Sequence, residues 1–276
     1  SQKGSKKAAG EWIRTLLAFR SALQRLLRVD LPAAIDWKNY VDSRQDDDLF
    51  RSPEERQHGR TALTLFGAEV SGKNIVFVVD VSGSMRTTDP EPPGGRKGPR
   101  GKTVVGDPAE RDPESAAKAA ERRRRITRAK KELGRVIRSL PEDVRFNVVA
   151  FSSDVTSWKP ALVPASRGNK KRATSFVGGL EAEGITVTDM ALEEAFGDLE
   201  LDTVYLITDG APTHVGSTGR GLPEDARELM ELILERMKVL NFLRDVRIFS
   251  LGFQGAEEDF LKKLSREHGG RYVRID

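Results

Sequence analysis

Strand-like and helix-like segments alternate along residues 72–276, and this alternation constrains the fold more than any other feature of the sequence. The clearest strand is Asn74–Asp80, a β-branched and aromatic apolar run that ends in a carboxylate. Both of its faces are apolar, as expected at the centre of a parallel sheet that is covered on both sides. We therefore predict an α/β fold, with a doubly wound, mostly parallel sheet flanked by helices.

The other elements follow from the period of the apolar residues. Apolar β-branched runs predict further strands at residues 144–151, 203–208, 246–251 and 271–275. Apolar side chains at three- and four-residue steps predict helices at residues 116–140, 170–180, 188–196, 223–242 and 257–268. Pro141 ends the first of these helices, and Pro223 stands in the first turn of the fourth.

Two segments fall outside this pattern. Residues 1–71 form a predicted N-terminal helical extension, with an amphipathic helix at 11–29 and short helices or irregular chain over 30–70. Residues 86–115 are rich in Gly, Pro and charge, which predicts a flexible insertion. We expect the extension to be followed by one domain, residues 72–276, that carries this insertion.

The composition excludes several kinds of site. The chain has no cysteine, which rules out disulfides, thiolate metal sites and cysteine nucleophiles. No apolar run approaches the roughly 18 residues that a membrane-spanning helix needs, so we expect no membrane span. The net charge of +4 is unevenly spread, because residues 96–131 alone hold 13 Lys or Arg and 5 Asp or Glu. The basic character therefore belongs to the insertion and the helix after it.

Polar side chains gather at the ends of two predicted strands. Asp80, Ser82 and Ser84 stand at the end of the first strand, Asp209 follows the third, and Thr186 precedes a helix between them. Open α/β sheets bind ligands beyond the carboxyl ends of their strands. Carboxylate and hydroxyl oxygens suit hard cations such as Mg²⁺ or Mn²⁺. The predicted ligands are Asp80, Ser82, Ser84, Thr186 and, through a water molecule, Asp209.

A motif resemblance accompanies this candidate site. The run Asp80-Val81-Ser82-Gly83-Ser84 resembles the Asp-x-Ser-x-Ser motif of the metal-ion-dependent adhesion site (MIDAS) in von Willebrand factor A (VWA) domains. Thr186 and Asp209 stand where that family has a threonine and a later aspartate. The resemblance implies a Rossmann-like sheet, a bound Mg²⁺, Mn²⁺ or Ca²⁺, and a partner whose acidic side chain completes the coordination. Ile185 and Val187 depart from the Gly and Asn that many members have beside the threonine.

We interpret the chain as a metal-dependent binding or adhesion module, not an enzyme, whose partner is a protein or acidic polymer that supplies a carboxylate. Three alternatives stay open. A metal at the strand ends would activate water in a hydrolase, although the sequence places no histidine or second carboxylate cluster there as a base. The metal would be structural or absent in a scaffold. The basic insertion would bind nucleic acid or another acidic polymer, with affinity that falls as salt rises.

Nucleic acid is the less favoured partner, because no tyrosine or tryptophan interleaves with the basic run 122–125, which we interpret as a solvated helix start. Residues 31–42 loosely resemble segments that join helical-repeat regions to VWA domains, so a helical-repeat neighbour is an expected partner. Asp189 is predicted to be a solvated first-turn acid, and His214 to lie on the rim of the site. The compartment stays open, with an extracytoplasmic location favoured over a cytoplasmic one.

Overall fold

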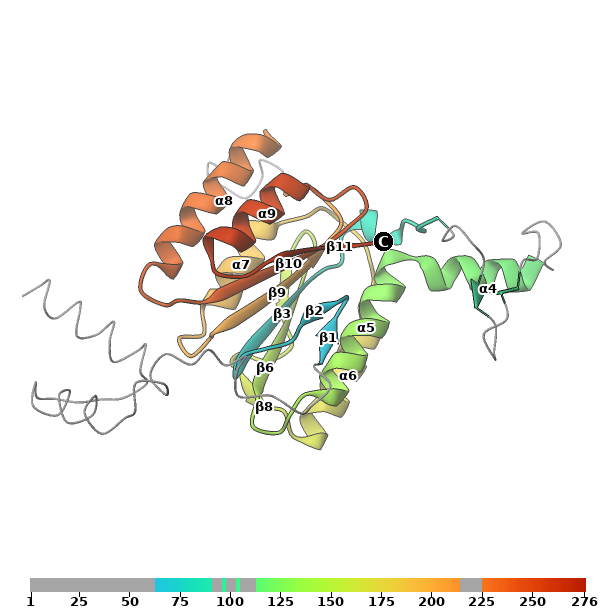
Figure 1. Cartoon of the computed structure of the whole chain (residues 1–276), viewed down its shortest axis with the longest axis horizontal. Coiled ribbons are helices and arrows are strands. Elements are labelled where there is room, and N and C mark those ends of the chain that lie inside the picture. The colour runs from blue at the N-terminus through green and yellow to red at the C-terminus, as the bar shows by residue number, and fades with distance from the viewer. Residues whose placement is uncertain (1–62, 91–95, 98–102, 105–112, 214–224) are drawn as a thin grey trace, which may run out of the picture. The chain divides into compact units, whose positions relative to one another are not determined.

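The computed structural model describes residues 63–90, 96–97, 103–104, 113–213 and 225–276 (Figure 1). The predicted helix at 11–29 and His214 lie outside the described residues. One compact unit, Ala62–Val239 together with Val246–Asp276, contains the sheet and nearly all residues of its flanking helices. No helix in the described part of the chain is long and apolar enough to cross a membrane.

A sheet of seven strands forms the middle layer of the described domain, in the order β11-β10-β9-β3-β6-β7, with β8 also paired to β6. The strands are β3 (Asn74–Asp80), β6 (Arg145–Phe151), β7 (Val155–Ser157), β8 (Val163–Pro164), β9 (Thr203–Thr208), β10 (Arg247–Phe253) and β11 (Tyr272–Ile275). Strands β11, β10, β9, β3 and β6 run parallel. Strands β7 and β8 pair with β6 antiparallel. The predicted doubly wound, mostly parallel α/β sheet is confirmed.

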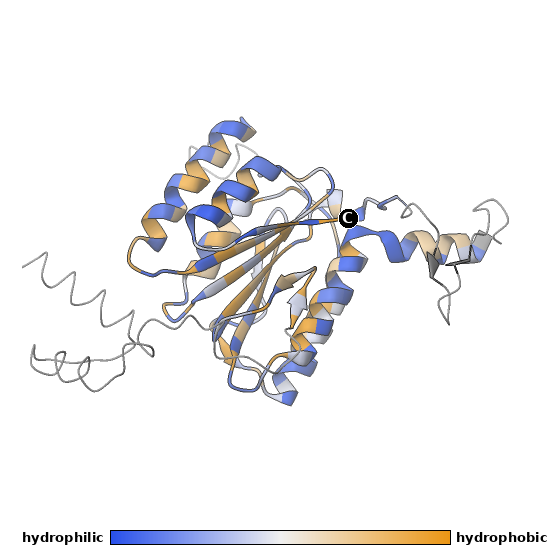
Figure 2. Ribbon diagram, in the orientation of Figure 1, coloured by the Kyte–Doolittle hydropathy of each residue, from blue (hydrophilic) through white to orange (hydrophobic). Residues whose placement is uncertain are grey.

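Helices cover both faces of this sheet, with α5 and α6 on one side and α7, α8 and α9 on the other (Figure 1). The helices are α4 (Pro113–Arg123), α5 (Arg125–Ser139), α6 (Arg167–Gly179), α7 (Thr188–Phe196), α8 (Ala226–Asn241) and α9 (Glu258–Glu267). Figure 2 shows apolar residues along the strands and polar residues on the outer sides of the helices. The amphipathic period thus decides which side each helix turns toward the sheet.

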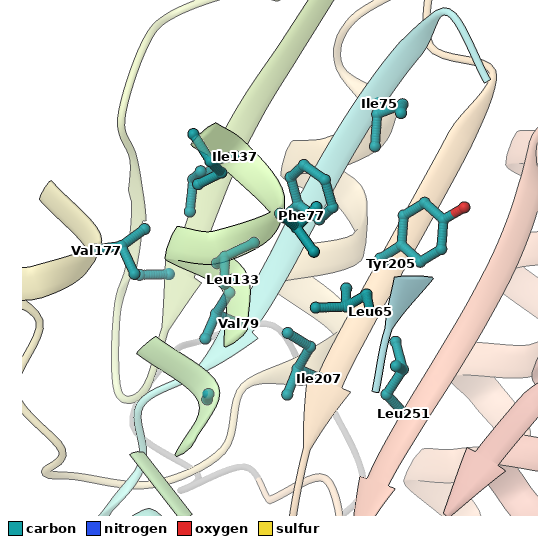
Figure 3. Packing of buried hydrophobic residues seen from close by; sticks show 14 of the residues in the cluster. Leu65, Ile75, Phe77, Val79, Leu133, Ile137, Val177, Tyr205, Ile207 and Leu251 are labelled. Carbon is teal, nitrogen blue, oxygen red and sulfur yellow. The ribbon is translucent and has the colours of Figure 1, made fainter. Parts of the chain in front are cut away.

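Strand β3 lies at the centre of the sheet, between β6 and β9. Its alternate side chains Ile75, Phe77 and Val79 belong to a hydrophobic cluster that includes Leu133 of α5 (Figure 3). The ring of Phe77 stacks on that of Tyr205 of β9, with ring centroids 5.6 Å apart. A strand buried on both faces accounts for the unbroken apolar run, and places the carboxylate that ends it at the edge of the core.

The chain before β3 differs from the expectation of short helices or irregular structure. It forms an antiparallel hairpin of β1 (Thr64–Leu65) and β2 (Ala68–Glu69). Phe66 and Gly67 have positive φ angles of 49° and 83°, as in a two-residue type I′ turn. Leu65 is fully buried in the same cluster as Phe77. Part of the predicted extension therefore packs into the domain core, while the predicted domain boundary itself stays a prediction.

The single helix predicted at residues 116–140 is two helices, α4 and α5. Arg124 leaves the helical conformation, with φ −57° and ψ 134°, and forms an antiparallel bridge with Thr88. The Arg125 backbone N–H donates a hydrogen bond to the Thr87 carbonyl (3.0 Å). The pairing of these two distant segments interrupts the helix, which apolar periodicity alone does not reveal.

Regular structure also extends into the insertion at 86–115. Strands β4 (Arg96–Lys97) and β5 (Thr103–Val104) pair antiparallel, and α4 begins at Pro113. These residues form regular structure without an apolar period, because backbone pairing in a short hairpin needs none. That the insertion is flexible stays a prediction. The remaining residues between β4, β5 and α4 lie outside the described residues.

Candidate functional site

Strands β3 and β9 lie side by side where the strand order reverses. From β3 the chain crosses to β6 on one side, and it later returns to β9 on the other. The parallel register pairs Val79 with Ile207, so Asp80 and Asp209 follow neighbouring strands at the same edge of the sheet. The crevice at such a reversal is where open α/β sheets bind ligands. Topology thus brings together two carboxylates that are distant in the sequence.

Asp80 ends β3 and is fully buried. Its Oδ1 accepts a hydrogen bond from the Ser82 backbone N–H (2.8 Å), and its Oδ2 accepts one from the Thr208 hydroxyl (2.6 Å). Burial raises the pKa of Asp80 to about 6; hydrogen bonds from Ser82 and Thr208 oppose this shift, and the charge of Asp209 adds to it. A bound cation would offset the desolvation of this carboxylate.

A chain of hydroxyls joins the loop after β3 to the end of β9. The hydroxyl oxygens of Ser82 and Ser84 lie 3.0 Å apart. The Ser84 hydroxyl donates a hydrogen bond to Oδ1 of Asp209 (2.6 Å), a carboxylate that is buried. Four of the predicted ligand residues, from two separate loops, therefore lie within one connected polar cluster.

The loop before α7 forms the third wall of this cluster. Gly184 has a φ angle of +78°, and a Cβ atom added there would lie 2.4 Å from Oγ of Ser153. The Gly184 carbonyl accepts a hydrogen bond from the Gly83 backbone N–H (3.0 Å). Only glycine fits this conformation and this close approach, which seats the loop directly on the serine turn after β3.

Thr186, on this same loop, faces the cluster. It is buried, and its backbone N–H donates to the Thr213 hydroxyl (2.9 Å). A Cβ atom added to Gly210 would lie 3.6 Å from the Thr186 hydroxyl oxygen and 3.7 Å from that of Ser84. The fifth predicted ligand residue thus shares one small space with Ser84, and the absence of a side chain at Gly210 keeps that space open.

Arg125, at the start of α5, is a site residue that the sequence-based reasoning missed. Its Nη1 donates to Oδ2 of Asp209 (2.7 Å), and its Nε donates to Oδ1 of Asp89 (2.9 Å). Its side chain is only 11% exposed, although the basic run at 122–125 was predicted to be a solvated helix start. Burial lowers the pKa of Arg125, but its bonds and charge interactions with Asp209 and Asp89 raise it overall.

Asp189 also departs from its predicted environment. It was expected to be a solvated acid in the first turn of α7, yet it is buried, with 4% exposed. The start of α7 lies against the end of β6, where the Val187 backbone N–H donates to the Ser152 carbonyl (3.1 Å). The first turn of this helix therefore packs against the end of β6, a position that helical periodicity does not report.

The donors at this crevice fit a hard divalent cation. They are two carboxylates and three hydroxyls: Asp80, Asp209, Ser82, Ser84 and Thr186. Among the described residues, no group of three or more His, Cys, Asp or Glu is placed to hold a metal ion. A set of donors with two carboxylates and three hydroxyls suits Mg²⁺ and Mn²⁺, which use few carboxylates and retain waters.

Comparison with known proteins gives the family context of this site. A family model described as "von Willebrand factor type A domain" matches residues 73–92 and 116–274. The human inter-alpha-trypsin inhibitor heavy chain H4 is 29% identical over 223 residues, which cover 76% of this chain and 19% of that protein. The human von Willebrand factor A domain-containing protein 3A is 30% identical over 130 residues, or 46% of this chain and 10% of that protein.

The chain spans about a fifth of the length of the inter-alpha-trypsin inhibitor heavy chains that it matches. Among solved structures, a von Willebrand factor type A protein from Catenulispora acidiphila is similar, with a TM-score of 0.50 and 18% sequence identity. The similar region covers 75% of this chain and 39% of that chain. At this identity the likeness supports the fold.

Proposed function

Because this chain belongs to the von Willebrand factor type A domain family, we propose that it is a binding module that uses a divalent cation to engage an acidic partner. The cation would be Mg²⁺ or Mn²⁺, with Ca²⁺ as the next choice, held by the carboxylates and hydroxyls at the ends of β3 and β9. When bound, the ion would supply a positive centre that accepts a carboxylate from a protein or an acidic polymer.

One observation carries this proposal: the hydrogen bond from Ser84 to Asp209 joins the loop after β3 to the loop after β9. In the proposed site Asp80, Ser82 and Ser84 contact the ion directly. Thr186 adds a hydroxyl, and Asp209 acts through a water molecule. Hydroxyl ligands neutralise little of the ionic charge, so the ion keeps an affinity for an outside carboxylate.

A hydrolase is the main competing function. A cation that activates water would need a neighbouring base, and the donors of the proposed site are mostly hydroxyls. A screen with generic phosphate and ester substrates separates the two functions. Turnover that disappears in Asp80→Ala would favour the hydrolase over the binding module.

Nucleic-acid binding through the basic insertion and a metal-independent scaffold are further alternatives. Binding to nucleic acid would weaken steeply with salt and would survive Asp80→Ala. A scaffold would bind its partner equally well with and without a chelator. A helical-repeat neighbour and an extracytoplasmic location also stay predictions for this chain.

Calorimetric titration of the whole chain with MgCl₂ and MnCl₂ tests the proposal. We expect saturable binding to the wild type and none to Asp80→Ala. Asp143→Ala is the matched control. Asp143 lies just before the first residue of β6, at the edge of the sheet opposite to the proposed site, and its side chain is 63% exposed. Binding that persists in Asp80→Ala, or that Asp143→Ala removes equally, would contradict the proposed site.

A further inference from the structure

Arg125 shares the carboxylate of Asp209 with Ser84. Ser84 donates to Oδ1 (2.6 Å) and Arg125 donates to Oδ2 (2.7 Å). The arginine therefore places a full positive charge against one of the two carboxylates proposed to serve the cation. The Asp209 side chain has no exposed surface, and that of Arg125 is 11% exposed, so solvent screens this charge only weakly.

The backbone holds Arg125 in this position. Its N–H donates to the Thr87 carbonyl (3.0 Å), and the Thr87 N–H donates to the Ser84 carbonyl (2.9 Å). The arginine is thus tied to the same turn that carries the serine hydroxyls. Asp89, which is buried, accepts from the Arg125 Nε and from Nη1 of Arg128. Backbone and side-chain hydrogen bonds therefore both hold the Arg125 guanidinium in the cluster.

The balance of charge around the crevice follows from these contacts. The carboxylates of Asp80, Asp209 and Asp89 carry three negative charges, and the guanidiniums of Arg125 and Arg128 carry two positive charges. With a divalent ion present the cluster is positive by one charge. Without the Arg125 guanidinium the same loaded cluster would be neutral and would attract an acidic partner less.

We propose that Arg125 sets the balance between cation affinity and acidic-ligand affinity at this site. By compensating Asp209, it lowers the affinity for the cation alone. The same positive charge raises the affinity of the loaded site for a carboxylate. This inference rests on the proposed function, and it adds the residue that sets the balance between the two affinities.

The test compares three variants with the wild-type chain by calorimetry, using MnCl₂ or MgCl₂ alone and then acetate at saturating metal. Arg125→Gln removes the charge, so we expect metal affinity to rise roughly tenfold and acetate affinity to fall by a similar factor. Arg125→Lys keeps the charge and should stay near the wild type. Arg135→Gln, on the same helix but paired with Glu132, is the control and should change neither affinity.

Asp89→Asn gives the opposite perturbation, because it keeps both arginines and removes a negative charge. We expect weaker metal binding and tighter acetate binding, by roughly threefold each. This variant tests the proposal even if Arg125→Gln fails to fold, as thermal unfolding of the metal-free chain would show. A purely structural role for Arg125 predicts a lower unfolding temperature, with metal affinity not raised in Arg125→Gln and acetate affinity not raised in Asp89→Asn.

The outcomes separate this inference from the proposed function. Metal binding to the wild type that Arg125→Gln leaves unchanged or weakens would overturn the inference and leave the metal site standing. Metal binding by Arg125→Gln but not by the wild type would support it in its strongest form. Absence of metal binding in the wild type and all four variants would overturn both.

Discussion

The hydroxyl oxygen of Ser84 lies 2.6 Å from a carboxylate oxygen of Asp209, so the loops after β3 and β9 meet at one point. The two residues are 125 positions apart in the sequence, so local structure cannot bring them together. The parallel pairing of β3 with β9 brings the two loops together. A substitution at either residue therefore tests both the fold and the proposed site.

Ser84→Ala should weaken Mg²⁺ or Mn²⁺ binding by roughly 10- to 100-fold, because it removes one proposed ligand and the donor that orients Asp209. Calorimetry measures the loss directly. Ser157→Ala is the matched control, since the Ser157 hydroxyl also donates to a carboxylate, Glu194, over 2.6 Å. Equal affinities for the two variants would remove Ser84 from the metal site.

Asp80→Asn should stabilise the metal-free chain by about 1–3 kcal/mol at neutral pH, because burial of the charged carboxylate destabilises the fold. The asparagine oxygen can still accept the hydrogen bond from the Ser82 N–H. Urea unfolding in the presence of a chelator measures the difference. The same variant should gain no stability from added Mg²⁺, unlike the wild type, and an unfolding midpoint that rises with metal in both chains would contradict the assignment.

Gly184→Ala should destabilise the fold by about 1–3 kcal/mol and weaken metal binding, because its φ of +78° and the nearby Ser153 hydroxyl leave no place for a Cβ atom. The loop that carries Thr186 would have to shift. Gly178→Ala is the control: it lies in α6 with no atom within 4 Å of an added Cβ, so alanine there should stabilise by about 0.5–1 kcal/mol. Thermal and urea unfolding compare the two.

His268 should make the stability of the metal-free chain depend on pH. Burial lowers its pKa below the ordinary value of 6.5; the charge of Glu267 opposes this shift, and that of Lys238 adds to it. Below pH 6.5 the unfolded chain therefore takes up a proton that the folded chain does not, and stability falls as the pH drops through this window. Unfolding of wild type and His268→Gln from pH 8 to pH 5 measures this contribution. A difference between them that stays constant over this range would contradict it.

The local sequence by itself determined those elements whose apolar pattern lies entirely within one segment. The run Asn74–Asp80 predicted β3 with its bounds, since an unbroken apolar strand is stable only when both faces are covered. Asp80, Ser82 and Ser84 were predictable as a group, because a turn of five residues after a strand keeps them together. The parallel sheet then places the end of β9 beside them.

Only the tertiary structure decided the place of Arg125, the break at Arg124 and the hairpin around Leu65. The pair of Arg125 with Asp209 spans 84 positions, and a basic run read locally resembles a solvated helix face. Apolar periodicity indicates which side of one element faces the core, but it does not predict which loops come together when the strands pair. The ligand motif of the candidate site can therefore be found in the local sequence, whereas its charge depends on tertiary contacts between distant segments.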